Sequence, residues 1–510
     1  MYMRTKTLNY LSSFIFLSTL FSSYLLGLAF YDSTTGLDWF KYFNTVGYFL
    51  GFETEITDAQ GAFYFSLIAI FIELKADSLQ SDNWSLILNN SIQFANFILY
   101  IIGTIGIFAL FRKKGYKFFT ILLSISILNF FPPALYFRLT MKPEVLGFAL
   151  LPWAIYSLEL YFEKRNITTL LFSSSLIAIL VTQKASISGM VFLVLITFFF
   201  NEVKNIKNNL QLLFVGMFST MLLLYENSNI TGKWLFEKPT PVSADLANKW
   251  DHTADISFFY NIDFKNLLEN PFKHLHADSI LSITMLDTLS DYFGFFWNNK
   301  NTTNYIAFDR ILFTENFLIQ TYLQQYISIL FTISFYLFIV LFYIKKIRNR
   351  KYLLLPLSGF FILILNALGF PSKNFDPLTG DLFKVHYYSF LIALTFCFLL
   401  MHLINSYKYS ALLITLLIPI FLLSIGFPKE IDDDRRIGIG IRIAESELCK
   451  LTKGFIDESC DSTLNKYEDK YSRKITEFAE KKEQHKNLNI NLIICFLSIS
   501  TGFLTIYKND

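Results

Sequence analysis

Charged residues are scarce in this sequence, and their scarcity limits the class of protein it can encode. Asp, Glu, Lys and Arg make up 17% of the 510 residues, whereas hydrophobic residues make up 53% and the mean hydropathy is +0.42. A soluble protein of this composition would expose too much apolar surface to water, so lipid is the expected solvent. The net charge of +3 is too small to indicate a nucleic-acid partner.

The motifs of soluble enzymes are missing as well. The sequence has no glycine-rich loop that opens a nucleotide-binding helix, no HExxH zinc motif and no CxxC pair. ATP-driven transport by this chain alone is therefore not expected. No cofactor is specified either: a pair of carboxylates described below can hold a divalent cation, but two such ligands do not define a metal site.

Cysteine is rare, with four residues in the chain. Cys397 and Cys495 fall within apolar runs, where cysteine usually packs as a small hydrophobic side chain. Cys449 and Cys460 share a polar segment near the C-terminal end. A disulfide between them is predicted if that segment lies in an oxidising compartment.

What the sequence does contain is a series of long apolar runs. About 20 apolar residues in a helix are needed to cross the hydrocarbon core of a membrane. About twelve spans are predicted, at residues 10–30, 91–111, 118–137, 145–162, 168–181, 186–200, 210–225, 320–344, 352–370, 389–404, 411–427 and 488–507. A shorter run, 62–74, is predicted to form an interfacial or re-entrant helix. The expected fold class is therefore an all-α polytopic membrane protein.

Basic residues flank the predicted spans on alternate connections, and this alternation predicts the topology. They are Arg4, Lys6, Arg112 to Lys117, Lys164, Arg165, Lys204, Lys207, Lys345 to Lys351, and Lys408. Because Lys and Arg are retained on the cytoplasmic side, both termini are expected in the cytoplasm of a plasma (inner) membrane protein. The core, 1–427, then has external loops at 31–90 and 226–319. A small external helical domain, 428–487, precedes the last span and tail, 488–510.

Acidic residues that are suited to proton transfer occur in the first external segment. Asp32 and Asp38 follow the first span, and Asp38 precedes an aromatic stretch, a glycine turn and the apolar run 62–74. A carboxylate at this place can act as a general base and accept the proton of a hydroxyl group that serves as a nucleophile. A solvated aspartate that caps a helix is the alternative interpretation.

This order of features resembles the GT-C membrane glycosyltransferases, in particular the group of protein O-mannosyltransferases and aminoarabinose transferases. The resemblance implies a polyprenyl-phosphate sugar as the donor, inverting transfer, and an acidic residue of the first external loop as the general base. That role carries over to Asp38, with Asp32 as the alternative base. In the protein O-mannosyltransferases a glutamate directly follows the aspartate, whereas Trp39 follows it here.

A second resemblance lies between the third and fourth spans, where residues 138–144 read RLTMKPE. The segment is similar to an Arg/Lys-Pro-Glu/Asp element of these transferases, which implies substrate-binding roles for Arg138, Lys142 and Glu144. Pro143 suits a helix start and Glu144 is favourable in a first helical turn, while the cations can face a phosphate. An ordinary charged helix entrance is the alternative.

A third resemblance lies in the second large external segment, where residues 282–297 read SITMLDTLSDYFGFFW. It is similar to an Asp-Thr-x-x-Asp-Tyr-x-Gly-aromatic element of bacterial membrane glycosyltransferases. A helix would place Asp287 and Asp291 on one face, and with Tyr292 they would form a sugar-binding edge. The alternative is a helix cap or turn that stabilises the fold.

The fourth resemblance opens the tenth span, where residues 380–388 read GDLFKVHYY. It is similar to a Lys-Gly-x-Tyr or Arg-Tyr stretch whose basic residue contacts the carrier phosphate in these enzymes. Lys384, His386 and Tyr387 are therefore predicted to bind a phosphate headgroup. A lysine that reaches toward the interface, beside tyrosines of the aromatic belt, is the alternative.

Together these signals predict a GT-C-like glycosyltransferase of the cell envelope. It would move a sugar from a polyprenyl-phosphate donor to an extracytoplasmic acceptor, which is a glycan, a lipid or a protein. A transporter or flippase of lipid-linked saccharides is one alternative, although the charges cluster at one face instead of the membrane midplane. A non-catalytic membrane assembly partner is the other.

Overall fold

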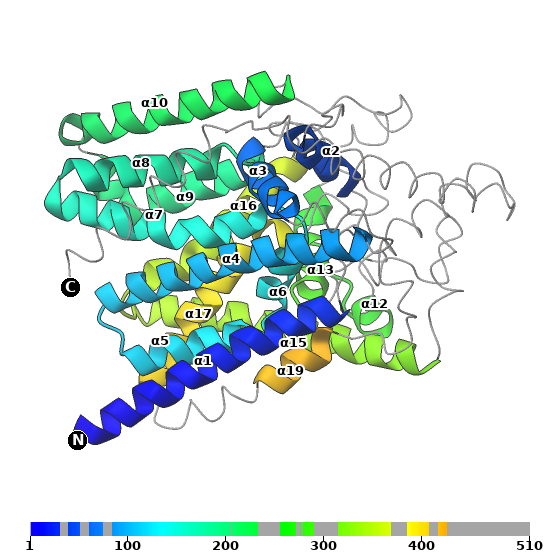
Figure 1. Ribbon diagram of the computed structural model, residues 1–510. Coiled ribbons are helices and arrows are strands. Elements are labelled where there is room, and N and C mark those ends of the chain that lie inside the picture. The colour runs from blue at the N-terminus through cyan, green and yellow to red at the C-terminus, as the bar shows by residue number, and fades with distance from the viewer. Residues whose placement is uncertain are drawn as a thin grey trace, which may run out of the picture.

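The protein is an assembly of helices (Figure 1). The computed structural model describes residues 2–30, 39–50, 61–74, 84–204, 206–232, 256–271, 276, 279–289, 315–368, 385–406 and 417–425, and every statement below concerns these ranges. All regular elements within them are α-helices or 3-10 turns. The expected all-α class is therefore confirmed for the part of the chain that is described.

Seven of these helices are long and apolar enough to cross a membrane. They are α1 (Tyr2–Phe30), α4 (Trp84–Lys113), α7 (Glu144–Lys164), α9 (Ala185–Val203), α10 (Ile206–Thr231), α15 (Glu315–Ile344) and α17 (Ser389–Ser406). Each coincides with an apolar run that the sequence predicts as a span. The chain is therefore a membrane protein with several spanning helices.

The other elements are shorter. They are α2 (Trp39–Phe49), α3 (Ala62–Glu73), α5 (Phe118–Leu128), α6 (Pro132–Leu139), α8 (Ile167–Val181), α12 (Phe264–Glu269), α13 (Ile280–Asp287), α16 (Leu355–Ala367), α19 (Leu417–Ile425), η2 (Ile256–Phe259), η5 (Arg350–Leu354) and η6 (Val385–Tyr388). Three predicted spans fall on α8, on η5 with α16, and on α19. At about 1.5 Å per residue, the 15 residues of α8 reach about 22 Å, less than the hydrocarbon thickness of about 30 Å. The last predicted span, 488–507, lies outside the described residues, and the count of twelve stays a prediction.

The predicted span 118–137 is not one straight helix. It is divided into α5 and α6, whose axes differ by 67°. The break falls at Pro132 and Pro133, which occupy the first turn of α6. Proline has no N–H for an intrahelical hydrogen bond and disfavours helical backbone in the residue before it, so the helix ends and restarts in a new direction. The bend brings the segment 138–144 to the end of the bundle.

The long helices run roughly parallel, so their connections gather at two ends of the bundle (Figure 1). One end, called the basic end here, holds residues 112–117, 159–165, 198–204 and 345–351. Lys113 Nζ lies 2.9 Å from Glu163 Oε1, and Arg165 donates to Asn209 Oδ1 at 2.6 Å. Lys351 donates to the carbonyl of Phe198 at 2.8 Å. Basic clusters predicted on separate connections therefore meet at one end.

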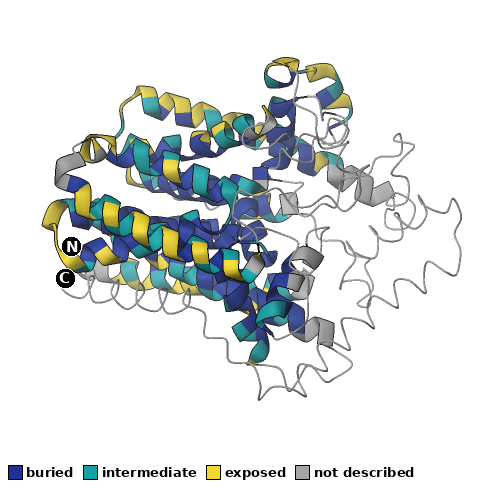
Figure 2. Ribbon diagram, turned by 90° about the horizontal axis from the view of Figure 1, so that it is seen from above, coloured by how far each residue is buried: buried dark blue, intermediate teal, exposed yellow. Residues whose placement is uncertain are grey.

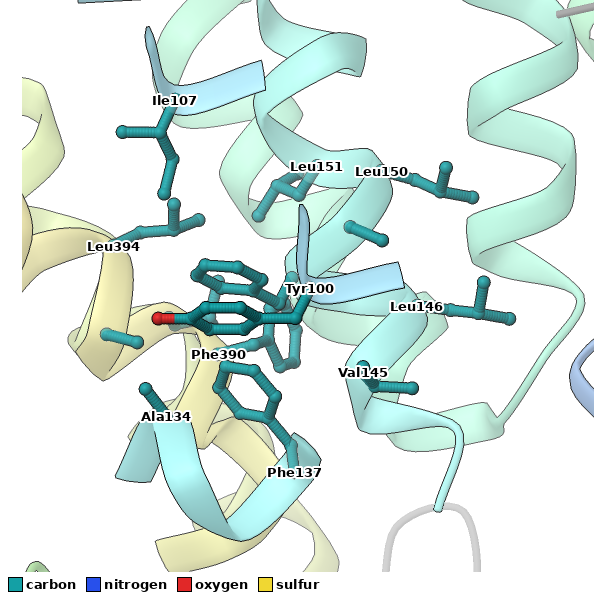
Figure 3. Close-up of a cluster of buried hydrophobic side chains, with 14 of the residues drawn as sticks. Tyr100, Ile107, Ala134, Phe137, Val145, Leu146, Leu150, Leu151, Phe390 and Leu394 are labelled. Atoms are coloured by element: carbon teal, nitrogen blue, oxygen red, sulfur yellow. The ribbon is translucent and has the colours of Figure 1, made fainter. Parts of the chain in front are cut away.

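Aromatic packing fills the centre of the bundle. Figure 3 shows Tyr100 of α4 among side chains of α6, α7 and α17. Its ring stacks on Phe148 at a centroid distance of 5.0 Å, and Phe137 lies 4.8 Å from Phe148. Because lipid offers no hydrophobic driving force between helices, such close van der Waals contact is a main source of helix association in a membrane.

The outer helices expose large apolar side chains. Figure 2 shows exposed residues along the outer helices of the bundle and buried residues within it. Phe14 of α1, Phe214 of α10 and Leu330 of α15 are 69%, 73% and 67% exposed. Apolar exposure on this scale is unfavourable in water but favourable against acyl chains. The burial pattern therefore agrees with a lipid bilayer around the helices.

The short helix α3 is buried rather than laid on a surface. Residues Ala62 to Phe65 are fully buried, and α3 contacts α2, α4 and α10. An interfacial helix would keep a polar face in water, so this burial favours the re-entrant alternative over the interfacial one. The start of α3 approaches the connection between α8 and α9 so closely that a Cβ on Gly61 would lie 2.6 Å from Gln183 Cα.

This close approach generates a prediction for Gly61→Ala. The added methyl group would overlap backbone atoms that cannot rotate away, so the variant is expected to lose about 1–3 kcal/mol of stability. Gly216→Ala is the matched control: nothing lies within 4 Å of a Cβ there, and the mid-helix change should be neutral or slightly stabilising. Thermal unfolding in detergent measures both. Equal melting temperatures for the two variants would contradict the docking of α3.

Candidate functional site

The end of the bundle opposite the basic end collects most of the predicted site residues that are described. It is called the polar end here and comprises five segments: the connection 140–143 between α6 and α7, the connection 182–184 between α8 and α9, the start of α3, the end of α13, and η6. Helix α6, α9, α13 and α16 all contact η6. In Figure 1, α3, α6 and α13 lie toward this end, away from the N-terminus. Segments that are far apart in the sequence thus meet around one short turn.

A buried ion pair lies at the centre of the polar end. Lys184 Nζ is 2.8 Å from Glu144 Oε1, and it lies 4.2 Å from the centroid of the Tyr387 ring. The Glu144 side chain is fully buried, whereas the Lys184 side chain keeps 15% of its exposure. Glu144 is the first residue of α7, where the helix dipole favours a negative charge. The pair therefore joins α7, α9 and η6.

The second carboxylate oxygen of Glu144 is unusual. Oε2 is buried, and no described residue donates a hydrogen bond to it. A buried charged oxygen without a donor is costly, and such groups in native proteins usually serve a ligand, a water molecule or a reaction. The amide nitrogen of Gln183, the neighbour of Lys184, is also buried without an acceptor among the described residues. The polar end therefore has spare hydrogen-bonding capacity beside a cation and an aromatic ring.

The start of α3 is capped by this same region. A helix leaves its first N–H groups without partners inside the helix, and Gly61, the N-cap residue, has no side chain to supply one. The amides of Gly61 and Tyr64 donate to the backbone and side-chain oxygens of Gln183, at 2.6 and 3.2 Å. The Ala62 amide donates to Asn227 Oδ1 at 3.0 Å, and Asn227 donates in turn to the Thr182 carbonyl. The connection that carries Lys184 is thereby held by α3 and by α10.

Arg138 lies apart from the ion pair. It is 1% exposed and donates to Ser23 Oγ and to the Ser23 carbonyl, both at 2.8 Å. Its guanidinium also lies 5.2 Å from the Tyr100 ring centroid. These contacts join α6 to α1 and α4. Nε has no acceptor among the described residues, yet the group is directed toward α1, so its placement fits a structural role better than the predicted contact with a phosphate.

Lys142 lies in the α6–α7 connection and is partly buried, with Nζ 5.8 Å from the Tyr136 ring centroid. The Asn96 side chain holds this connection in place: it donates to the Thr140 carbonyl at 2.8 Å and accepts from Tyr64 Oη at 2.9 Å. The predicted segment 138–144 is therefore split. Its Arg faces α1, and its Glu faces Lys184.

Asp287 is brought to the same place from about a hundred residues away. It is 1% exposed, and its Oδ2 accepts a hydrogen bond from the Val385 amide at 2.8 Å. Val385 opens η6, so Asp287 caps a turn that belongs to another segment. The described part of α13 ends at Asp287, and Asp291, its predicted neighbour on the same helix face, lies outside the described residues. The observed contact matches the alternative prediction of a cap that stabilises the fold.

Of the fourth predicted segment, Tyr387 is partly buried beside Lys184. The backbone of His386 lies in η6 next to it. An added Cβ on Gly359 of α16 would overlap the Tyr388 side chain, so only glycine permits η6 to pack this closely on α16. The other predicted residues lie outside the described part of the chain: Asp32, Asp38, Asp291, Tyr292, Lys384, Cys449 and Cys460.

The residue that sequence reasoning missed is Lys184. A signal for it exists: Lys184 is a single cation in a short connection that, in the predicted topology, faces away from the side where basic residues gather. Gln183 and Asn227 carry no comparable signal, because uncharged polar residues are common near helix ends. Among the described residues, no group of three or more His, Cys, Asp or Glu side chains could hold a metal ion.

The chain matches no protein-family model, and neither a curated protein nor a solved structure is significantly similar to it.

The ion pair generates a second prediction. Lys184→Met leaves the buried Glu144 carboxylate without its cation and is expected to cost about 3–5 kcal/mol of stability. The double variant Glu144→Gln with Lys184→Met removes both charges and should recover most of that loss. Thermal unfolding in detergent measures the cycle.

Lys265→Met is the matched control for this cycle. Lys265 and Glu269 form an exposed pair at 4.0 Å, with side chains 83% and 61% exposed. Exposed pairs contribute little, so this variant should melt within about one degree of the unaltered protein. A double variant that melts no higher than Lys184→Met alone would show that the pairing does not stabilise the fold.

Proposed function

We propose that the chain is a membrane glycosyltransferase that takes a sugar from a polyprenyl-phosphate donor and transfers it to an extracytoplasmic acceptor, which is a glycan, a lipid or a protein. The proposal places the polar end at the external face of the plasma (inner) membrane. The observation that carries it is the buried Glu144 carboxylate beside the Tyr387 ring: one oxygen pairs with Lys184, and the other has no donor among the described residues.

The chemistry of such a donor fits this arrangement. A polyprenyl-phosphate sugar combines a long apolar chain, an anionic phosphate and a ring of hydroxyl groups. Lys184 supplies a compact cation that retains some exposure, and ammonium groups are common phosphate ligands. Tyr387 supplies an aromatic face, and Glu144 Oε2 supplies an acceptor for a sugar hydroxyl. Lipid-facing helices would hold the prenyl chain.

Each group then has a defined part in the proposed transfer. Asp38, or Asp32 as the alternative, would accept the proton of the acceptor hydroxyl as it attacks the sugar carbon. Lys184 would stabilise the negative charge that develops on the departing phosphate. Asp287 holds η6 through the Val385 amide and so positions Tyr387, since alignment of two substrates is itself a large part of catalysis.

The alternatives predict a different placement of charge. A transporter or flippase usually binds its substrate near the membrane midplane. The Glu144–Lys184 pair instead lies where helices α7 and α9 begin, at an end of the bundle. A non-catalytic assembly partner would not require the buried, incompletely paired carboxylate at all. Placement at the bundle end therefore supports the transferase over a transporter, and the incompletely paired carboxylate supports it over an assembly partner.

Transfer activity tests the proposal directly. The purified protein in nanodiscs is incubated with a panel of radiolabelled polyprenyl-phosphate sugars and with membrane extracts as acceptors. Label should leave the lipid with the unaltered protein, and Asp38→Asn should abolish transfer while Asp32→Asn retains it. If Asp32→Asn is the inactive variant, the base is reassigned. Bound but unconverted donor across a broad panel would favour a transporter or partner.

The role of Lys184 in the proposed transfer is tested with the double variant, which is expected to restore stability. Glu144→Gln with Lys184→Met should fold nearly as well as the unaltered protein but transfer at least about a hundredfold more slowly, because the charge on the departing phosphate is no longer stabilised. Lys265→Met serves again as the control. Full activity of the stable double variant would remove the pair from the reaction.

Cysteine labelling tests the proposed orientation of the chain in the membrane. With Cys397, Cys449, Cys460 and Cys495 replaced by serine, Tyr260→Cys should react with a membrane-impermeant maleimide on intact cells, since Tyr260 is 68% exposed in a predicted external segment. Lys117→Cys at the basic end should react only after permeabilisation. Labelling of both cysteines from the outside, or the reverse pattern, would contradict the proposed topology.

A further inference from the structure

The basic end contains a cavity that the proposed transfer does not use. It has a volume of about 390 Å³ and is lined by Lys114, Glu159, Phe198, Ile347, Asn349, Arg350, Lys351 and Tyr352. Three cations and one carboxylate thus share a space between the ends of α4, α7, α9 and α15. We propose that this cavity, called the basic pocket here, binds a phosphate group, carried either by the headgroup of an anionic lipid or by a soluble phosphate.

The charged side chains of the basic pocket differ in whether they already have a partner. Glu159 is paired with Lys114, and Lys113 Nζ lies 3.8 Å from its other oxygen. Lys351 donates to the Phe198 carbonyl, which lies beside a break in the helical backbone at Phe199. Arg350 has no ion pair or side-chain hydrogen bond with the described residues and lies 4.9 Å from the Tyr343 ring centroid. Both oxygens of Glu159 thus lie near lysines, although Oε2 accepts no hydrogen bond from the described residues, while the Arg350 guanidinium keeps its donors available.

The inner part of the pocket carries unused polar groups. Tyr352 is 3% exposed, and its hydroxyl has no partner among the described residues. Asn349 Nδ2 is a second buried donor; it has no well-aligned acceptor within the described residues, although its side chain lies near the Tyr116 hydroxyl. Both groups can donate to a phosphate oxygen, and the planar guanidinium of Arg350 can bind two such oxygens at once. A buried donor beside a guanidinium that has no ion pair with the described residues is the counterpart of an anionic ligand.

The depth of the pocket agrees with a lipid phosphate. Lys114 directly follows the candidate span that ends at Lys113, and Ile347 lies three residues beyond the span that ends at Ile344. Lining residues from several helices therefore meet just past the apolar segments, at the level where headgroup phosphates lie. Basic pockets between transmembrane helices on the cytoplasmic side are a known way to recognise anionic headgroups. The site is separate from Lys184, which lies at the other end of the bundle.

Binding of a named probe tests the pocket. The full chain in detergent is titrated with phosphatidylglycerol and with phosphatidylcholine by native mass spectrometry, and with inorganic phosphate by calorimetry. Arg350→Gln should weaken phosphatidylglycerol binding at least about tenfold, because charged hydrogen bonds to the phosphate are lost. Lys345→Gln removes the same charge from the same end without lining the pocket and should stay within about twofold.

Tyr352→Phe separates the specific contact from general charge. The ring packs on Phe111 and Phe198 at 4.9 and 4.8 Å, and these contacts survive the change, so the variant should remain folded. Loss of the hydroxyl should weaken binding by about threefold to tenfold. This variant keeps the proposal testable if Arg350→Gln fails to fold.

The binding results distinguish a lipid headgroup, a soluble phosphate and the absence of a specific site. Binding of phosphatidylglycerol alone, sensitive to Arg350→Gln, identifies a lipid headgroup, whereas equally sensitive binding of inorganic phosphate identifies a soluble ligand. Equal losses for Arg350→Gln and Lys345→Gln would mean general attraction to anionic lipid and would overturn the pocket. Unchanged binding in Arg350→Gln and Tyr352→Phe would overturn it as well. These measurements do not depend on transfer activity, so failure of the basic pocket can be distinguished from failure of the proposed function.

Discussion

The rest of the structure depends on one constraint: within hydrocarbon, a polar group must find its partner inside the protein. The start of α3 illustrates it, because three orphan amides are satisfied by Gln183 and Asn227 from two other elements. Lys351 likewise donates to the Phe198 carbonyl, beside the break in α9 at Phe199. Each such hydrogen bond ties a local irregularity of one helix to a residue of another. The irregular segments are therefore also the places where distant parts of the chain are joined.

The same constraint explains why the unsatisfied groups carry functional meaning. Most buried polar side chains of the described residues sit in hydrogen-bonded networks, such as Tyr64 with Asn96 and Thr140. Glu144 Oε2 at the polar end and the Tyr352 hydroxyl at the basic end are among the buried polar atoms that have no hydrogen-bond partner within the described residues. Each lies beside a cation, at opposite ends of the bundle. Both proposals start from such an atom together with the cation and the ring or cavity beside it.

Much of the architecture could be predicted because lipid imposes a simple requirement on sequence. Long apolar runs predicted the seven long helices within about ten residues at their ends, and basic clusters predicted which connections share an end. The bend at Pro132 was not predicted, because the apolar run continues through it without interruption. Its cause, the two prolines, is nevertheless visible in the sequence. The candidate site was predicted in part, since Glu144, Asp287 and Tyr387 lie at one end of the bundle. Arg138 instead donates to Ser23. Lys184, which forms the ion pair with Glu144, was not predicted.

Composition and periodic patterns along the chain are enough to predict the helical class and the long apolar helices, because these are local properties of the sequence. Only the tertiary structure decided which charges are paired. Glu144 and Lys184 are 40 residues apart, and Asp287 and Val385 are 98 apart. No pattern of neighbouring residues encodes such separations. They arise from helix packing, which places side chains within hydrogen-bonding distance according to where each helix ends and how it bends.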